Sequence, residues 1–204
     1  MLDGWARRRI DPALHSLARG VTGAGISANA VTVIGFCIGL LAALAIWQQL
    51  FLPGLVLLLL SRLCDGLDGA VAKINGRTDL GGYLDIVLDF AFYGAIPFGF
   101  ILADPGANAV AGAALIFSFY VNGASFLAYA VLAEKRGLTG SARGPKSLFF
   151  TTGLAEATET IAVFAAFCLF PDWFPVLAWM FAALCFYTTF SRILLAVRMF
   201  GVGQ

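Results

Sequence analysis

Charged residues are scarce in this chain, and their scarcity excludes the common classes of soluble protein. Only 12% of its 204 residues are Asp, Glu, Lys or Arg, whereas soluble domains carry about 25%. The formal net charge is +1, which argues against nucleic acid as a partner. Apolar residues make up 60%, and the mean hydropathy is +0.89. This composition predicts an all-α integral membrane protein.

Cysteines are also few, and none forms a close pair. Cys37, Cys64, Cys168 and Cys185 all lie in apolar surroundings. Because no C-x-x-C spacing is present, they predict neither a zinc site nor a disulfide framework. We interpret them as small packing residues. Residues 1–9 are rich in arginine and lack the apolar core of a cleavable signal peptide.

Long apolar runs, by contrast, are abundant and predict six transmembrane helices in a single domain over residues 1–204. A helix needs about 20 apolar residues to cross a bilayer. Polar residues or prolines interrupt the apolar sequence between the runs. The predicted spans cover about residues 31–47, 53–73, 79–102, 109–132, 146–170 and 174–197.

The segment before the first span, residues 1–30, has a mixed composition. Trp5, Ile10, Leu14 and Leu17 recur at helical spacing with arginines between them. This pattern predicts an amphipathic helix that lies in the membrane interface. A disordered basic leader is the alternative interpretation.

Lysines and arginines predict the orientation of the spans. The connections at 48–53, 103–108 and 171–173 contain neither residue type. Cytoplasmic loops carry an excess of Lys and Arg, so both termini are predicted to be cytoplasmic, in a membrane of the bacterial inner-membrane type. The segments assigned to the cytoplasm contain Arg7, Arg8, Arg9, Arg19, Lys73, Arg77, Lys135, Arg136, Arg143, Lys146 and Arg198.

Four aspartates lie inside this apolar sequence, and an ionisable group in a membrane is costly enough to indicate function. Asp65 and Asp68 are spaced i,i+3, and Asp85 and Asp89 are spaced i,i+4, so each pair shares a helix face. Both pairs lie roughly 8 to 16 Å from the cytoplasmic ends of their helices. Clustered carboxylates suit a divalent cation. The alternative is that they are packing residues or protonated acids.

These residues resemble the signature of the CDP-alcohol phosphatidyltransferases. Asp-x-x-Asp-Gly-x-x-Ala begins at Asp65, and Gly-x-x-x-Asp-x-x-x-Asp ends at Asp89. Residues 26–32 are also similar to the segment before that family's first span. Two positions depart from the pattern: Lys73 stands where arginine is usual, and Ala28 where proline is usual.

The resemblance implies a transferase of phospholipid biosynthesis that displaces CMP from a CDP-linked lipid donor such as CDP-diacylglycerol. The acceptor would be an alcohol or a phosphorylated alcohol, and the enzyme would be a homodimer. Asp65, Asp68 and Asp85 would hold one or two Mg²⁺ or Mn²⁺ ions. Asp89 would share the coordination and act as the catalytic base. The nucleotide-binding residues would be Asn29, Gly69, Ala72, Lys73 and Gly81.

The predicted cytoplasmic loop between the fourth and fifth spans is basic. Its charges either set the topology next to anionic headgroups or bind an acceptor phosphate. The residues concerned are Lys135, Arg136, Arg143 and Lys146.

Two glutamates, Glu156 and Glu159, and two arginines, Arg62 and Arg192, also lie within predicted spans. One interpretation is that the four side chains form ion pairs and neutralise one another. The other is that the glutamates shape a pocket for a cationic or polyhydroxyl acceptor.

Two further function classes compete with the transferase. A cation transporter would show internal repeats or broken helices near the bilayer midplane, and the sequence has no clear repeat. An inactive family member that serves as a scaffold would not need all four aspartates.

Overall fold

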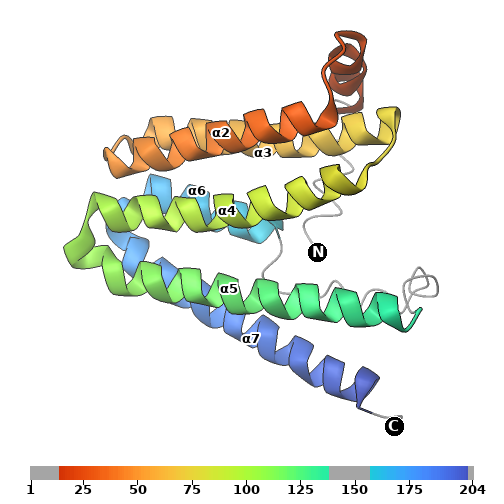
Figure 1. The fold of residues 1–204 in the computed structure, drawn as a ribbon. Helices are drawn as coiled ribbons and strands as arrows, with labels where there is room; N and C mark the ends of the chain where they lie inside the picture. Colours follow the sequence, from red (N-terminus) through yellow and green to blue (C-terminus); the bar gives the residue numbers. More distant parts are fainter. Residues whose placement is uncertain (1–13, 138–156, 202–204) are drawn as a thin grey trace.

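The computed structural model describes residues 14–137 and 157–201, and every regular element within these ranges is helical (Figure 1). Residues 14–23 form a helix ahead of the first long one. The remaining elements are α2 (Ala28–Trp47), α3 (Phe51–Asn75), α4 (Asp79–Ala103), α5 (Pro105–Lys135), α6 (Ala157–Leu169), the short 3-10 helix η2 (Pro171–Trp173) and α7 (Phe174–Phe200).

Side-chain caps explain where three of these helices begin. Ser27 accepts a hydrogen bond from the backbone of Ala30, and Thr78 accepts one from Gly81. Asp104 accepts one from Ala107 over 3.0 Å and is the single residue between the end of α4 and the start of α5. Helix α5 therefore begins four residues before the predicted start of the span at about residue 109, because a proline after a capping aspartate begins a helix.

Four of the described helices are long and apolar enough to cross a bilayer, and they make the chain an integral membrane protein. They are α2, α4, α5, and α7 counted as one span with the short η2 that precedes it. Helix α3 has 25 residues, but it contains four charged residues, Arg62, Asp65, Asp68 and Lys73. The described α6 has 13 residues, and residues 146–156 of the predicted fifth span lie outside the described ranges.

The helices pack as an antiparallel series in which α2 lies against α3 and α4, α4 against α5, and α5 against α7 (Figure 1). The three connections without Lys or Arg lie at the same end. Gln49, after α2, donates to the backbone oxygen of Ala103, at the end of α4, over 3.1 Å. The same end contains Asp104 and Asp172, which line one cavity with Gln49. The short connection between α3 and α4 lies at the opposite end.

Small residues let α2 approach its neighbours closely. A Cβ atom on Gly35 would lie 2.8 Å from Cβ of Cys64 on α3, and one on Gly99 of α4 would lie 2.7 Å from the backbone oxygen of Ala43. Such close contact is how helices associate without a driving force from water. A buried core of aromatic and aliphatic side chains joins α4 to α6 and α7. Helix α2 packs against both α3 and α4, and the acidic residues of these two helices thereby reach one site.

Candidate active site

Three of the four predicted aspartates meet between α3 and α4. One carboxylate oxygen from each of Asp65, Asp68 and Asp85 lies within 4.8 Å of the other two. Asp68 is buried, Asp65 is half-buried and Asp85 is exposed. The group therefore lies at the edge of the packed interior, with one side open.

The chemistry of this group fits a divalent cation. Atom Oδ2 of Asp68 is buried and has no hydrogen-bond partner among the described residues. A buried acceptor without a partner is unfavourable, and a cation would satisfy it. Three carboxylate oxygens are the donor set that Mg²⁺ and Mn²⁺ prefer over soft ligands. The residues present therefore fit one such ion.

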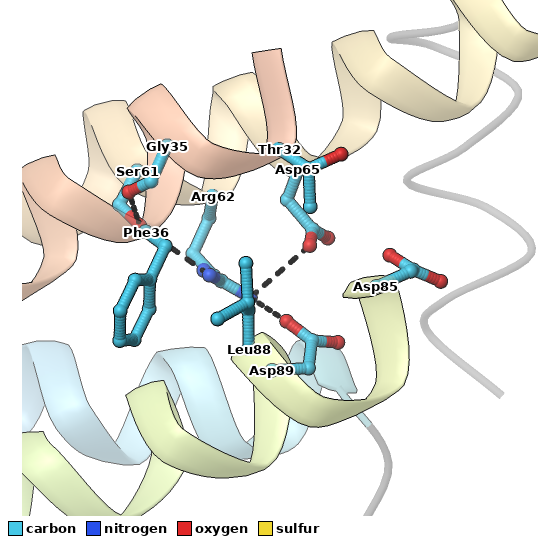
Figure 2. A pocket seen from close by; sticks show the side chains of 9 residues that line it. All are labelled: Thr32, Gly35, Phe36, Ser61, Arg62, Asp65, Asp85, Leu88 and Asp89. Carbon is cyan, nitrogen blue, oxygen red and sulfur yellow. Dashed lines mark hydrogen bonds and ion pairs between the residues drawn. The ribbon is translucent and has the colours of Figure 1, made fainter. Parts of the chain in front are cut away.

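Asp89, the fourth aspartate, does not belong to this group of three. Its Oδ1 accepts a hydrogen bond of 2.6 Å from Nη1 of Arg62. The same nitrogen lies 3.5 Å from Oδ1 of Asp65. Figure 2 shows the guanidinium between the two carboxylates. The structure thus gives Asp89 a protein cation as its nearest charged neighbour.

The contacts of Arg62 were not predicted from the sequence, for which one of two interpretations paired it with glutamates. Its side chain is only 9% exposed. The guanidinium carbon lies 3.7 Å from the centre of the Phe92 ring, close enough for a cation–π interaction. One signal in the sequence could have indicated that Arg62 lies close to Asp65. Arg62 precedes Asp65 by three residues and so shares its helix face.

The interpretation in which the glutamates neutralise the arginines does not hold for Glu159, the described one of the two glutamates. Arg192 donates to the backbone oxygen and side-chain oxygen of Asn122 and, over 2.6 Å, to the hydroxyl of Ser125. Neither Arg62 nor Arg192 forms an ion pair with Glu159 in the described part of the chain. Atom Oε2 of Glu159 is buried without a hydrogen-bond partner there. Glu156 lies outside the described residues.

Two of the predicted nucleotide-binding residues are brought together. A Cβ atom on Gly81 would lie 2.9 Å from Oδ1 of Asn29. Gly69 faces open space, since a Cβ atom added there would have nothing within 4 Å. Ala72 is half-buried, and Lys73 is exposed in the last turn of α3.

The predicted acceptor-binding residues are less fully described. Lys135 and Arg136 are exposed at the end of α5. Arg136 donates to the backbone oxygens of Met199 and Phe200, over 3.3 and 3.1 Å, and so caps the end of α7. Arg143 and Lys146 lie outside the described residues.

A small cavity of about 10 Å³ adjoins the aspartates, with room for one water-sized group. It lies between α2, α3 and α4 (Figure 2). The residues that line it are Thr32, Gly35, Phe36, Ser61, Arg62, Asp65, Asp85, Leu88 and Asp89.

Comparison with known sequences places this site in context. The model of the family described as CDP-alcohol phosphatidyltransferase matches residues 26–190. The inner membrane protein YnjF of Escherichia coli is 49% identical over 193 residues, which cover 95% of this chain and 94% of that protein. The archaetidylinositol phosphate synthase of Pyrococcus horikoshii is 32% identical over 97 residues, 47% of this chain and 52% of that protein.

Solved structures share the fold. The apo form of Mycobacterium tuberculosis phosphatidylinositol phosphate synthase (PgsA1) has a TM-score of 0.73 and 20% identity, over 93% of this chain and 99% of that one. The same enzyme with CDP-DAG bound has a TM-score of 0.68 and 21% identity, over 88% of this chain and 91% of that one.

Proposed function

The chain belongs to the CDP-alcohol phosphatidyltransferase family, whose members transfer substituted phosphate groups, and on that premise we propose its reaction. The donor is a CDP-linked lipid such as CDP-diacylglycerol, the acceptor is an alcohol or a phosphorylated alcohol, and CMP is released. The product is a phospholipid or its precursor. One observation carries the proposal: three carboxylates from α3 and α4 converge on a point, and one of them has a buried oxygen without a partner among the described residues.

The family relatives support the choice of substrates. The Pyrococcus relative is named for archaetidylinositol phosphate synthesis, and a structure with this fold was solved with CDP-DAG bound. A diphosphate-linked lipid suits a site that opens beside apolar helices, because its charged and apolar parts need different surroundings.

The proposed roles follow the positions of the side chains. Asp65, Asp68 and Asp85 hold Mg²⁺ or Mn²⁺. When bound, such an ion neutralises diphosphate charge and stabilises the leaving group. Asp89 is the base: the acceptor oxygen attacks phosphorus, the bond from phosphorus to the CMP oxygen breaks, and the hydroxyl proton passes to the Asp89 carboxylate. Arg62 fixes the orientation of that carboxylate through the 2.6 Å hydrogen bond.

The nucleotide end of the donor lies, in this proposal, against α2 and the facing ends of α3 and α4. Gly69 leaves open space for its approach, and Asn29 meets Gly81 beside it. Lys73 supplies a positive charge for phosphate but lacks the fork of an arginine, and Ala72 precedes it on α3. The acceptor is bound from the cytoplasmic side, with Lys135, Arg136, Arg143, Lys146, Glu156 and Glu159 as candidate contacts.

We also propose the full membrane arrangement predicted from the sequence. It comprises one domain of six spans, in which α3 and α6 join the four apolar helices, preceded by an interfacial helix that includes residues 14–23. Both termini and the site face the cytoplasm, in agreement with the connections that lack Lys and Arg. The relative in Escherichia coli is an inner membrane protein. A homodimer is the proposed assembly.

Purified protein tests the reaction directly. The chain in detergent is incubated with CDP-diacylglycerol, Mg²⁺ or Mn²⁺ and a panel of alcohols, and CMP release is followed. The panel contains glycerol 3-phosphate, inositol, inositol phosphate, serine and phosphatidylglycerol. We expect metal-dependent CMP release with at least one acceptor. Folded protein that binds CDP and releases no CMP with any acceptor would favour a scaffold role instead.

A further inference from the structure

Arg62 places a guanidinium where two of the four aspartates converge. Its Nη1 lies 2.6 Å from Oδ1 of Asp89 and 3.5 Å from Oδ1 of Asp65. A cation that two carboxylates share must lie between them, as this nitrogen does. The guanidinium therefore lies where a cation shared by Asp65 and Asp89 would have to lie (Figure 2).

Packing holds the guanidinium in that position. Phe92 of α4 lies beneath it, with the ring centre 3.7 Å from the guanidinium carbon. Its Nη2 donates to the hydroxyl of Ser61 over 3.3 Å. That hydroxyl in turn donates to the backbone oxygen of Gly35 on α2 over 2.7 Å. Contacts from α2, α3 and α4 thus oppose the departure of Arg62 from the two carboxylates.

From this arrangement, and resting on the proposed function, we propose that Arg62 takes the place of a second divalent ion. The chain then binds one ion through Asp65, Asp68 and Asp85, the group whose oxygens lie within 4.8 Å of one another. Arg62 supplies the positive charge between Asp65 and Asp89 and acts as a positioning residue for the base. The sequence alone left one and two ions equally open.

The space at the site supports a single ion. The cavity beside the guanidinium has a volume of about 10 Å³, which is room for one water-sized group. Mg²⁺ usually keeps several of its water ligands when a protein binds it. A hydrated ion therefore does not fit into this cavity beside the guanidinium. An ion without its waters would touch the guanidinium, and like charges repel strongly where water is excluded.

Counting the bound ions tests the proposal without relying on turnover. Mn²⁺ binding to the full chain in detergent is measured by equilibrium dialysis, and the bound ions are observed by electron paramagnetic resonance. Wild type, Arg62→Gln, Arg62→Lys and Arg192→Gln are compared. Arg192 is the matched control because it is also an arginine within a long apolar helix, but it donates to the neutral Asn122 and Ser125.

We expect one magnetically isolated Mn²⁺ per chain in the wild type, in Arg62→Lys, which keeps the charge, and in the control. Arg62→Gln removes the charge and opens space, so we expect two ions per chain and an exchange-coupled spectrum, since paired ions in such sites lie about 4 Å apart. Two ions in the wild type, or a single ion in both the wild type and folded Arg62→Gln, overturns the proposal. If Arg62→Gln does not fold, the wild-type count still decides.

CMP release measured on the same samples separates this inference from the proposed function. If the wild type binds two ions and releases CMP, only the proposed role of Arg62 is overturned. A single ion in the wild type and two in Arg62→Gln, without CMP release from any donor and acceptor pair, support the role of Arg62 and overturn the reaction. A wild type that binds no Mn²⁺ overturns both.

Discussion

The guanidinium of Arg62 on α3 donates a hydrogen bond of 2.6 Å to the carboxylate of Asp89 on α4. This contact divides the four aspartates of the site into two kinds. Three of them form a compact group of oxygen donors, and the fourth is held by a protein cation. Because the two kinds have different partners, substitutions at Asp68 and at Asp89 should have different consequences.

Asp68→Asn should weaken Mn²⁺ binding by at least about 100-fold and reduce CMP release in parallel. Even residues that only support a metal ligand cost 10–100-fold when changed, and Asp68 contributes a buried oxygen without another partner among the described residues. Calorimetric Mn²⁺ titration checks the affinity. Asp79→Asn, a change of the same type at an exposed aspartate in the first turn of α4, is the control and should bind Mn²⁺ normally.

Asp89→Asn should reduce kcat for CMP release by about 10² to 10⁴-fold, the usual contribution of a general base, and should leave Mn²⁺ affinity within a few-fold of wild type. An amide can still accept the hydrogen bond from Arg62, but it cannot take the acceptor's proton. Steady-state kinetics and Mn²⁺ titration on one preparation check both parts. Loss of Mn²⁺ binding in this variant would identify Asp89 as a metal ligand and contradict the assignment.

Gly81→Ala should raise KM for the CDP-linked donor by about tenfold, an effect equal to one hydrogen bond to a charged group. Its Cβ would lie 2.9 Å from Oδ1 of Asn29. The end of a side chain can move, so the cost should appear in nucleotide binding rather than in folding. Donor titrations of initial rate provide the measurement. Gly82→Ala has open space around its Cβ and is the neighbouring control; equal KM values in the two variants would argue against this role of Asn29.

Gly99→Ala should lower the free energy of unfolding by about 1–3 kcal/mol, as overpacked interiors do. Its Cβ would lie 2.7 Å from the backbone oxygen of Ala43, and a backbone cannot move aside as a side chain can. Helices α2 and α4 would have to separate. Gly94→Ala on the same helix meets nothing within 4 Å and should be neutral or stabilising. Thermal unfolding in detergent, followed by fluorescence, checks this prediction. Equal unfolding temperatures for the two variants would contradict it.

Much of this architecture follows from local sequence, whereas the partners that the embedded charges find on other helices do not. The spacing of the four aspartates on two antiparallel helices predicted a single cluster. The structure brings Asp65, Asp68 and Asp85 together and places Asp89 against Arg62. Helices α2, α3, α4 and α7 begin and end within three residues of the corresponding predicted spans. Helix α5 begins four residues earlier than its span, where Asp104 caps it directly after α4. The partners of Arg62 and Arg192 depend on which helices become neighbours.

Those neighbours are set by close packing at small residues rather than by charge. Gly39 shows the dependence: a Cβ there would lie 2.5 Å from Cδ2 of Phe92, the ring on which Arg62 rests. Periodicity identifies such a glycine as part of a helix face. It does not say which side chain fills the space that the glycine leaves.

Glu159→Gln should change the choice of acceptor and leave donor binding as it is. Oε2 of Glu159 is buried without a hydrogen-bond partner among the described residues, and the described arginines of the neighbouring helices are engaged elsewhere. A carboxylate in that state attracts a cationic or hydroxyl-rich group, and the amide keeps the shape while removing the charge. We expect the ratio of kcat/KM between two acceptors of the panel to change by about tenfold, which corresponds to about 1.4 kcal/mol.

Glu134→Gln, at an exposed glutamate near the end of α5, is the control. Unchanged ratios in folded Glu159→Gln would remove Glu159 from the acceptor site.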